Sequence, residues 1–328
     1  MIKAIGIAAV LTLISGCTGA KQRPSATGEQ ASAATPSYTA NADSLYSHVE
    51  RQMAFGPRTP GSEGHRECGD MIVRRLHAYG VDSVAQQHAP VTLYNGSRFT
   101  ARNILGSINP TADQRILLLA HYDTRPWADN DPDPDNHSKP VPGANDGASG
   151  VAVLLETARL LGHALPDSIG VDLLFVDLED SGVSGGEGTE ETWCLGTQEW
   201  VKQMPYTAEN RPRFGILLDM VGGADARFHR EYFSNRAAPS LVNRVWAIAR
   251  EAGYGDRFIN NQGGAVVDDH LFINRAGIPC IDIIESTNTA TGSFNPTWHT
   301  IDDDLPAIDR NTLKAVTQTV LNVIASPL

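Results

Sequence analysis

The sequence predicts an α/β fold whose central sheet is buried on both faces. Short, continuous apolar runs that are typical of buried strands recur along the chain, at residues 104–105, 116–119, 171–176, 216–218 and 278–284. Helical patterns lie before, between and after these runs, at residues 44–55, 63–79, 148–161, 198–204, 240–252, 269–276 and 311–324. Such strands alternating with helices are typical of a sheet that helices cover on both sides.

Local signals support individual elements. In the segment 63–79, Met71, Ile72 and Leu76 share one helical face, and Gly80 follows at the position of a helix stop. Residues 130–141 are polar and contain three prolines, so we expect a long surface loop there. Loops of that length in a compact domain are often functional.

The N-terminal segment has the pattern of an export signal. Lys3 precedes an apolar run at residues 4–14 that is too short to span a bilayer comfortably. Residues 13–17, Leu-Ile-Ser-Gly-Cys, resemble a bacterial lipobox, so we expect residues 1–17 to be a lipoprotein signal peptide that ends at a lipidated Cys17. The alternative is an ordinary signal peptide with an incidental cysteine.

The rest of the chain is predicted to be a tether followed by one domain. Residues 18–42 are rich in small and polar residues, which predicts a flexible tether, and residues 43–328 have the pattern of a single domain. Together with the lipobox, this predicts a membrane-anchored bacterial lipoprotein on the periplasmic side of the outer membrane or at the cell surface. A single compact, acidic domain makes a monomer the default expectation.

The charge argues against a nucleic-acid partner, and the cysteine spacing argues against a cysteine zinc site. The formal charge of −12, from 26 basic and 38 acidic residues, argues against nucleic acid as a partner. Cys68, Cys194 and Cys280 have no partner at CxxC spacing, so a cysteine zinc site is not expected. An oxidising compartment would permit one disulfide among these three, and nothing in the sequence selects the pair.

Acidic and histidine residues gather just after the predicted strands. His121 and Asp123 follow the run at 116–119, and in an extended segment they point to the same side. Others stand after later strands or near helix starts: Asp146, Glu179, Asp180, Asp219, Asp268 and His299. Active sites of open α/β sheets are built at this edge.

Each of these residues taken alone has a simpler explanation, such as a helix N-cap for Asp146. Taken together, an Asp, a second carboxylate and a His are a suitable set of catalytic zinc ligands. Three protein ligands leave a fourth position open for the substrate. The sequence therefore predicts a zinc site.

The order of the motifs resembles that of the co-catalytic zinc aminopeptidases and of the glutaminyl cyclases built on the same fold. The matching segments are 121–123, 143–150, 179–180, 218–220, 269–270 and 298–300, read as His-x-Asp, Gly-Ala-x-Asp-x-Ala-x-Gly, an acidic pair, Leu-Asp-Met, Asp-His and Trp-His-Thr. Residues 56–62 match as well, and the resemblance covers roughly residues 43–328. It implies a three-layer α/β/α sandwich with a central mixed, mostly parallel, twisted sheet.

Two details resemble the cyclases more than the peptidases. Asp268 precedes Asp269 and His270, where peptidases usually have serine, and Trp298 directly precedes His299. The run at 121–127 is also similar to bacterial cyclases. The resemblance implies an acyltransferase that converts the N-terminal glutamine of peptides and proteins to pyroglutamate and releases ammonia.

The resemblance also implies roles for particular residues. Asp146, Asp180 and His299 would bind zinc, with one ion as the expectation. Glu179 would be the acid/base, and Asp219 and Asp268 would form the supporting hydrogen-bond network. Trp298, together with Trp193, would line the substrate pocket, although simple packing remains an alternative for Trp193.

Two departures from the animal cyclases stand out. Asp180 replaces a glutamate, which shortens that ligand by one methylene, and Asp282 stands where those enzymes carry a histidine near the site. His121 and Asp219 could also help to hold a second zinc ion, as in the aminopeptidases. A dizinc aminopeptidase is therefore a rival function. A second rival, of a different class, is a non-catalytic lipoprotein that kept the fold for binding. An intact Glu179 argues against the latter.

Overall fold

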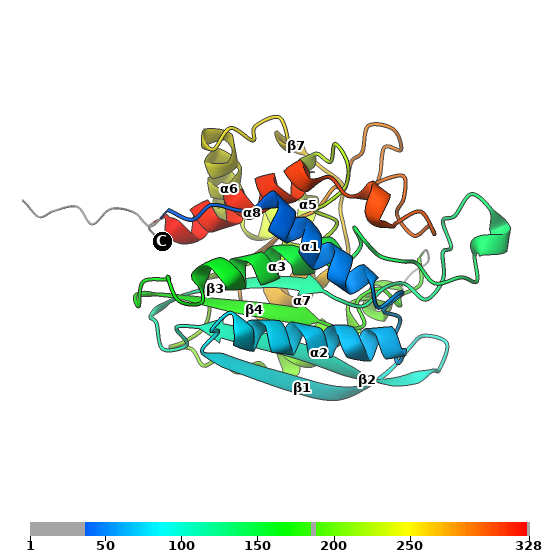
Figure 1. Ribbon diagram of the computed structural model, residues 1–328, viewed down its shortest axis with the longest axis horizontal. Coiled ribbons are helices and arrows are strands. Elements are labelled where there is room, and N and C mark those ends of the chain that lie inside the picture. The colour runs from blue at the N-terminus through cyan, green and yellow to red at the C-terminus, as the bar shows by residue number, and fades with distance from the viewer. Residues whose placement is uncertain (1–36, 185–187, 327–328) are drawn as a thin grey trace, which may run out of the picture. The chain divides into compact units, whose positions relative to one another are not determined.

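The computed structural model describes residues 37–184 and 188–326 (Figure 1). A six-stranded sheet has the order β1-β2-β4-β3-β5-β8, formed by Ser83–Thr92, Arg98–Ile108, Ile169–Val176, Gln114–His121, Phe214–Leu218 and Cys280–Ile283. The pairings from β4 through β3 and β5 to β8 are parallel, whereas β1 and β2 are antiparallel additions. The expected mixed, mostly parallel sheet is confirmed.

Helices cover both faces of this sheet, which confirms the three layers. One face carries α1, α2, α3, α6 and α8, formed by Ala42–Met53, Glu63–Ala78, Ala148–Leu161, Pro239–Glu251 and Arg310–Ala325 (Figure 1). The other face carries α4 and α7, formed by Leu195–Lys202 and Asp269–Arg275. Each of these seven helices was predicted, with ends that differ by a few residues at most.

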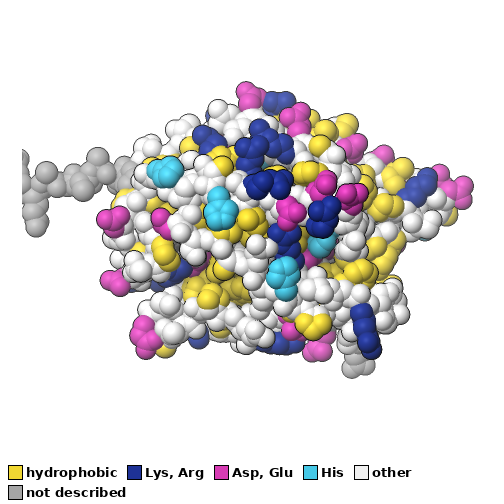
Figure 2. Space-filling view, turned by 60° about the horizontal axis from the view of Figure 1, so that its bottom comes forward, with side chains coloured by type: hydrophobic (Ala, Val, Ile, Leu, Met, Phe, Trp, Pro, Cys, Tyr) yellow, Lys and Arg dark blue, Asp and Glu magenta, His cyan; other side chains and the backbone are white. Residues whose placement is uncertain are grey.

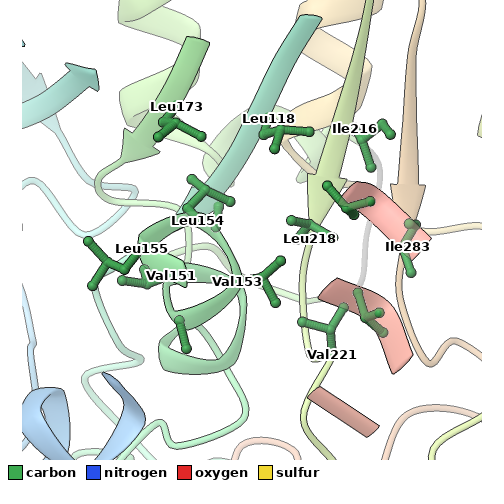
Figure 3. Close-up of a cluster of buried hydrophobic side chains, with 14 of the residues drawn as sticks. Leu118, Val151, Val153, Leu154, Leu155, Leu173, Ile216, Leu218, Val221 and Ile283 are labelled. Atoms are coloured by element: carbon green, nitrogen blue, oxygen red, sulfur yellow. The ribbon is translucent and has the colours of Figure 1, made fainter. Parts of the chain in front are cut away.

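The central strands are apolar on both faces because each face has its own core. Along β3, Ile116 and Leu118 join the core under α3 and α8, whereas Leu117 and Leu119 join the core under α4 and α7. Figure 3 shows the first of these cores, where α3 side chains meet those of β3, β4, β5 and β8. Full burial stabilises the folded state by about 1.5–3 kcal/mol for each such side chain.

Among the α-helices and strands of the described residues, four were not predicted from the sequence. They are β1, the short helix α5 at Tyr232–Ala237, and the two-stranded parallel sheet of β6 at Phe228–Arg230 and β7 at Phe258–Gln262. Strand β1 lies at the sheet edge, is largely exposed and contains Pro90. A polar edge strand lacks the continuous apolar run of a buried strand, so its pattern is weak.

The folded part of the chain begins earlier than residue 43. The Tyr38 hydroxyl donates to the carbonyl of Ala164 at 3.0 Å, and the Ala40 amide donates to Gln318 Oε1 at 3.0 Å. Asn41 caps α1. Residues 37–42 are thus ordered against the domain, and the tether prediction is wrong for them. The predicted signal peptide with Cys17, and residues 18–36, lie outside the described residues.

The surface carries charges of both signs. On the face shown in Figure 2, basic side chains lie beside acidic ones. Within residues 37–184 and 188–326, no helix is both long enough and apolar enough to cross a bilayer. The predicted loop at 130–141 holds only a 3₁₀ turn at Pro134–Asn136, as expected.

Candidate metal centre and active site

The predicted site residues meet at one edge of the sheet. His121 is the last residue of β3, Glu179 and Asp180 follow β4, and Asp219 follows β5. Because β3 lies between β4 and β5 and runs parallel to both, their carboxyl ends are adjacent. The change in strand order there makes this edge a crevice of the kind that binds ligands in α/β proteins.

The three predicted zinc ligands form a compact buried group. One oxygen or nitrogen from each of Asp146, Asp180 and His299 lies within 4.8 Å of the other two. His299 Nε2 is 3.2 Å from Asp180 Oδ1 and 3.8 Å from Asp146 Oδ2. These distances are compatible with three side chains that surround one ion.

The chemistry of this group fits zinc. Two carboxylates and an imidazole are ordinary zinc ligands, and three of them leave one position open. Asp180 Oδ2 is buried and has no hydrogen-bond partner among the described residues. A buried carboxylate oxygen without a partner is costly, and a bound cation removes that cost.

Asp146 is held by a residue that the sequence did not single out. The amides of Asn145 and Asp146 donate to the two oxygens of Asp303, at 2.9 and 3.0 Å. Asp146 is not the N-cap of α3, because Gly147 occupies that position with a φ of 99°. A Cβ on Gly147 would lie 2.6 Å from the carbonyl oxygen of His121, so only glycine fits there.

Arg58 explains why residues 56–62 belong to the motif set. Its guanidinium is fully buried and donates to the carbonyls of Tyr122, Pro142 and Gly143. The segment that leads to Asp146 is therefore fastened to the end of β3 by one arginine.

Glu179 and Asp180 are presented by a clamped turn. Their amides donate to Asp123 Oδ1 and Oδ2, at 3.1 and 3.2 Å. Leu178, just before them, has a φ of 53°. Cys194, Met220 and His299 also have positive φ, which are conformations that cost free energy and that cluster at functional sites.

A second group shares Asp146. His121 Nε2 lies 3.0 Å from Asp146 Oδ1 and 3.1 Å from Asp219 Oδ1, and the three side chains could also surround an ion. Burial alone would lower the pKa of His121, but contacts with Asp123, Asp146 and Asp219 outweigh it and raise the pKa well above its usual value.

Glu179 and Asp268 face the same space. Their carboxyl oxygens and the Cys194 sulfur lie within 4.8 Å of one another. Burial raises the pKa of Glu179 well above its usual value, and the neighbouring Asp268 raises it further. Burial likewise raises the pKa of Asp268, with Asp219 adding to the shift. A raised pKa favours the protonated carboxyl, so such a pair is suited to proton exchange with a substrate.

Cys194 is a contact of Glu179 that the sequence did not predict. Its thiol lies 3.3 Å from Glu179 Oε1, and its amide donates to the Glu179 carbonyl at 3.0 Å. Cys68, Cys194 and Cys280 are all buried and free, so the structure forms none of the disulfides that the sequence permits.

A pocket of about 200 Å³ opens onto these groups. Both predicted tryptophans line it, with Phe294, Val266 and Ile284 among the apolar neighbours. The ring of Trp298 stacks on His299 at a centroid distance of 3.8 Å, and Trp193 faces His299 from 6.2 Å at an interplanar angle of 19°. Trp193 therefore has a place in the pocket wall rather than in packing alone.

Asp282 lies outside the pocket lining. It is fully buried on β8. Its amide donates to Ser234 Oγ at 2.9 Å, and its carboxylate is 3.9 Å from His270 Nδ1. His270 in turn lies 3.3 Å from Glu231 Oε2. Glu231 accepts from the amide of Val266, a pocket residue, at 3.0 Å. Asp282 thus belongs to a buried cluster with His270 and Glu231, behind the part of the pocket wall that contains Val266.

Solved structures of similar sequence are cyclases and exopeptidases. A glutaminyl cyclase from Bacteroides thetaiotaomicron, bound to N-acetylhistamine, is 49% identical with a TM-score of 0.84 over 88% of this chain and 99% of that chain. A Zn-dependent exopeptidase from Parabacteroides distasonis is 47% identical with a TM-score of 0.84 over 90% of this chain and all of that one (100%).

More distant relatives show the same two kinds of protein. Glutaminyl-peptide cyclotransferase from Bos taurus is 28% identical over 78% of this chain and 74% of that protein. Aminopeptidase YwaD from Bacillus subtilis is 27% identical over 79% of this chain, which spans only about half (51%) of that protein's length. The sequence profile of peptidase family M28 matches residues 103–324. The chain belongs to peptidase family M28.

Proposed function

We propose that this protein is a zinc-dependent glutaminyl cyclase that converts the N-terminal glutamine of peptides and proteins to pyroglutamate. The family and the similar structures support a function of the glutaminyl cyclase or metallopeptidase type. The observation that carries the cyclase is the buried pair Glu179 and Asp268 at the metal-ligand group, inside a pocket with aromatic walls.

The reaction is a ring closure within one residue of the substrate. The α-amine nitrogen attacks the carbon of its own side-chain carboxamide, a carbon–nitrogen bond forms, and the bond to the amide nitrogen breaks as ammonia leaves. Intramolecular attack has a favourable effective molarity, so the protein needs chiefly to fold the substrate and move a proton.

Glu179 moves that proton. Its carboxylate accepts one from the attacking nitrogen and returns it to the departing nitrogen, which requires a raised pKa and reach to both atoms. Asp268 and Asp219 hold the surrounding hydrogen-bond network. Trp298 and Trp193 exclude water from a space suited to one small side chain.

Asp146, Asp180 and His299 would hold one zinc ion. When bound, zinc supplies a Lewis acid for the carboxamide oxygen. We propose one ion, as the resemblance to the glutaminyl cyclases implies, although His121, Asp146 and Asp219 could also surround an ion. A second ion at that group is the arrangement that the aminopeptidase function would need.

The products of a dipeptide assay distinguish the two functions. With Gln-Ala, we expect ammonia and an intact pyroglutamyl-alanine, because the attacking group is the substrate's own amine. With Leu-Ala, we expect no reaction. Mass spectrometry and an ammonia assay, with an enzyme-free control for spontaneous cyclisation, make the measurement. Free alanine from either dipeptide, without a pyroglutamyl product, would refute the cyclase function and support an aminopeptidase.

We also propose that Cys17 carries a lipid anchor that holds the domain at the membrane. The support is the lipobox-like segment and the small, polar residues that follow it. Several acyl chains together hold a protein firmly where one holds it weakly. Cys17→Ser should leave the precursor uncleaved or shift the protein to the soluble fraction. Membrane fractionation of a processed, wild-type-like form of this variant would refute the anchor.

A further inference from the structure

Arg125 is buried beside the metal-ligand group without belonging to it. Its side chain is 1% exposed. Nε and Nη2 donate to the two oxygens of Asp129, at 2.7 and 2.6 Å. Nη1 donates to the carbonyls of Asp180 and Gly182, at 3.3 and 3.2 Å, and lies 3.4 Å from Asp180 Oδ1. One guanidinium thus holds both the main chain and the carboxylate of a predicted zinc ligand.

Asp129 extends this contact to a second ligand. Its Oδ1 lies 3.3 Å from His299 Nδ1, while His299 Nε2 faces Asp146 and Asp180. The amide of Asn130 donates to the His299 carbonyl at 3.1 Å, which fastens the two segments together. The contact is an ion pair without hydrogen-bond geometry, and a carboxylate placed beside the outer nitrogen of a metal-binding histidine favours one tautomer and ring orientation.

Arg125 also lies in a stack of planar side chains. Its guanidinium carbon is 5.0 Å from the ring centroids of both Trp127 and Trp193. Trp193 in turn faces His299 and lines the pocket. A Cβ on Gly182 would come within 2.2 Å of the Trp193 ring, so that ring is confined between Gly182 and Arg125.

We propose that Arg125, acting with Asp129, is a positioning residue that orients Asp180 and His299 for zinc and holds Trp193 in the pocket wall. This proposal rests on the proposed zinc site, and it does not require Arg125 to contact the substrate. Lysine cannot replace it, because an ammonium lacks the planar fork that binds Asp129 twice and stacks between two indoles.

The test measures zinc affinity in purified protein by chelator competition. Arg125→Lys should raise the apparent Kd for zinc by about 10–100-fold, the scale of a lost partner behind a metal ligand. At saturating zinc, it should also raise KM for Gln-Ala, since Trp193 loses its support. Asp129→Asn should weaken zinc binding by a similar factor and change KM less than Arg125→Lys does, because the side chain that stacks on Trp193 is Arg125.

Arg159→Lys is the matched control. Arg159 also binds a carboxylate twice, Glu156 at 2.8 and 2.7 Å, but lies on α3 away from the metal-ligand group. It should leave the Kd for zinc within about twofold of wild type. Circular dichroism and thermal melting of the zinc-free proteins show whether each variant folds.

The outcomes separate this proposal from the proposed function. If both Arg125→Lys and Asp129→Asn lower the melting temperature but keep the wild-type Kd for zinc, Arg125 is merely structural. If Arg125→Lys does not fold, a wild-type Kd in Asp129→Asn is sufficient to overturn the proposal. If the wild-type protein binds zinc but only hydrolyses dipeptides, the cyclase function is refuted while the positioning role of Arg125 is not. If the wild-type protein binds no zinc, both proposals are refuted.

Discussion

Glu179→Gln should lower kcat for Gln-Ala by about 10²–10⁴-fold while the zinc content stays at the wild-type level. Glutamine has almost the same shape as glutamate but cannot accept a proton and hand it on. Glu179 is not in the metal-ligand group of Asp146, Asp180 and His299, so the change removes proton transfer without removing a ligand. Steady-state kinetics and elemental analysis on the same sample make the measurement.

An exposed carboxylate from the same loop provides the control. Glu191→Gln should keep wild-type kcat, since Glu191 lies on the surface. A Glu179→Gln protein that is folded, zinc-loaded and within tenfold of wild-type kcat would show that another group transfers the proton. Asp268, whose pKa burial also raises, would be the next candidate.

His299→Ala should abolish zinc binding at metal concentrations that saturate the wild type, and activity should be lost with it. The substitution leaves two carboxylates, Asp146 and Asp180, which cannot complete a three-ligand catalytic site. His299 is also the ring on which Trp298 stacks at 3.8 Å, so the pocket wall loses its support as well. Elemental analysis after dialysis, with circular dichroism to verify folding, is the measurement.

His77→Ala is the matched control, because His77 is exposed on α2 and far in sequence from every ligand. It should retain zinc and activity. An inactive but folded His299→Ala protein with full zinc content would place His299 outside the ligand set. Chelation of the wild type should abolish activity, and added zinc should restore it.

The arrangement of the site could be read from the sequence because of a general property of parallel sheets. Their strands are buried on both faces and appear as continuous apolar runs, and the polar residues after them meet at one edge. His121, Asp180 and Asp219 were each found in this way, at the ends of β3, β4 and β5. Asp146 and His299 lie in loops, and motif order rather than strand pattern located them.

The elements that the sequence did not predict have weak local patterns. Strand β1 lies at the sheet edge and is largely exposed, so it has no continuous apolar run, and the short strands β6 and β7 consist mostly of polar residues. Residues 37–42 were assigned to the tether from their small and polar side chains. Their order comes from contacts with Glu156 and Gln318, which no local pattern reports.

The residues that hold the site in place were decided by the tertiary structure alone. Asp303 binds the amide of Asp146 from 157 residues away, and Arg125 reaches Asp180 across 55 residues. An acidic or basic residue in a loop has no periodic signal, and its partner is set by how distant segments fold together. The sequence was enough to predict which side chains would carry the chemistry, because those follow strand ends and motif order. Only the fold decided which buried charges orient them, because a charge needs a partner and that partner can come from anywhere in the chain.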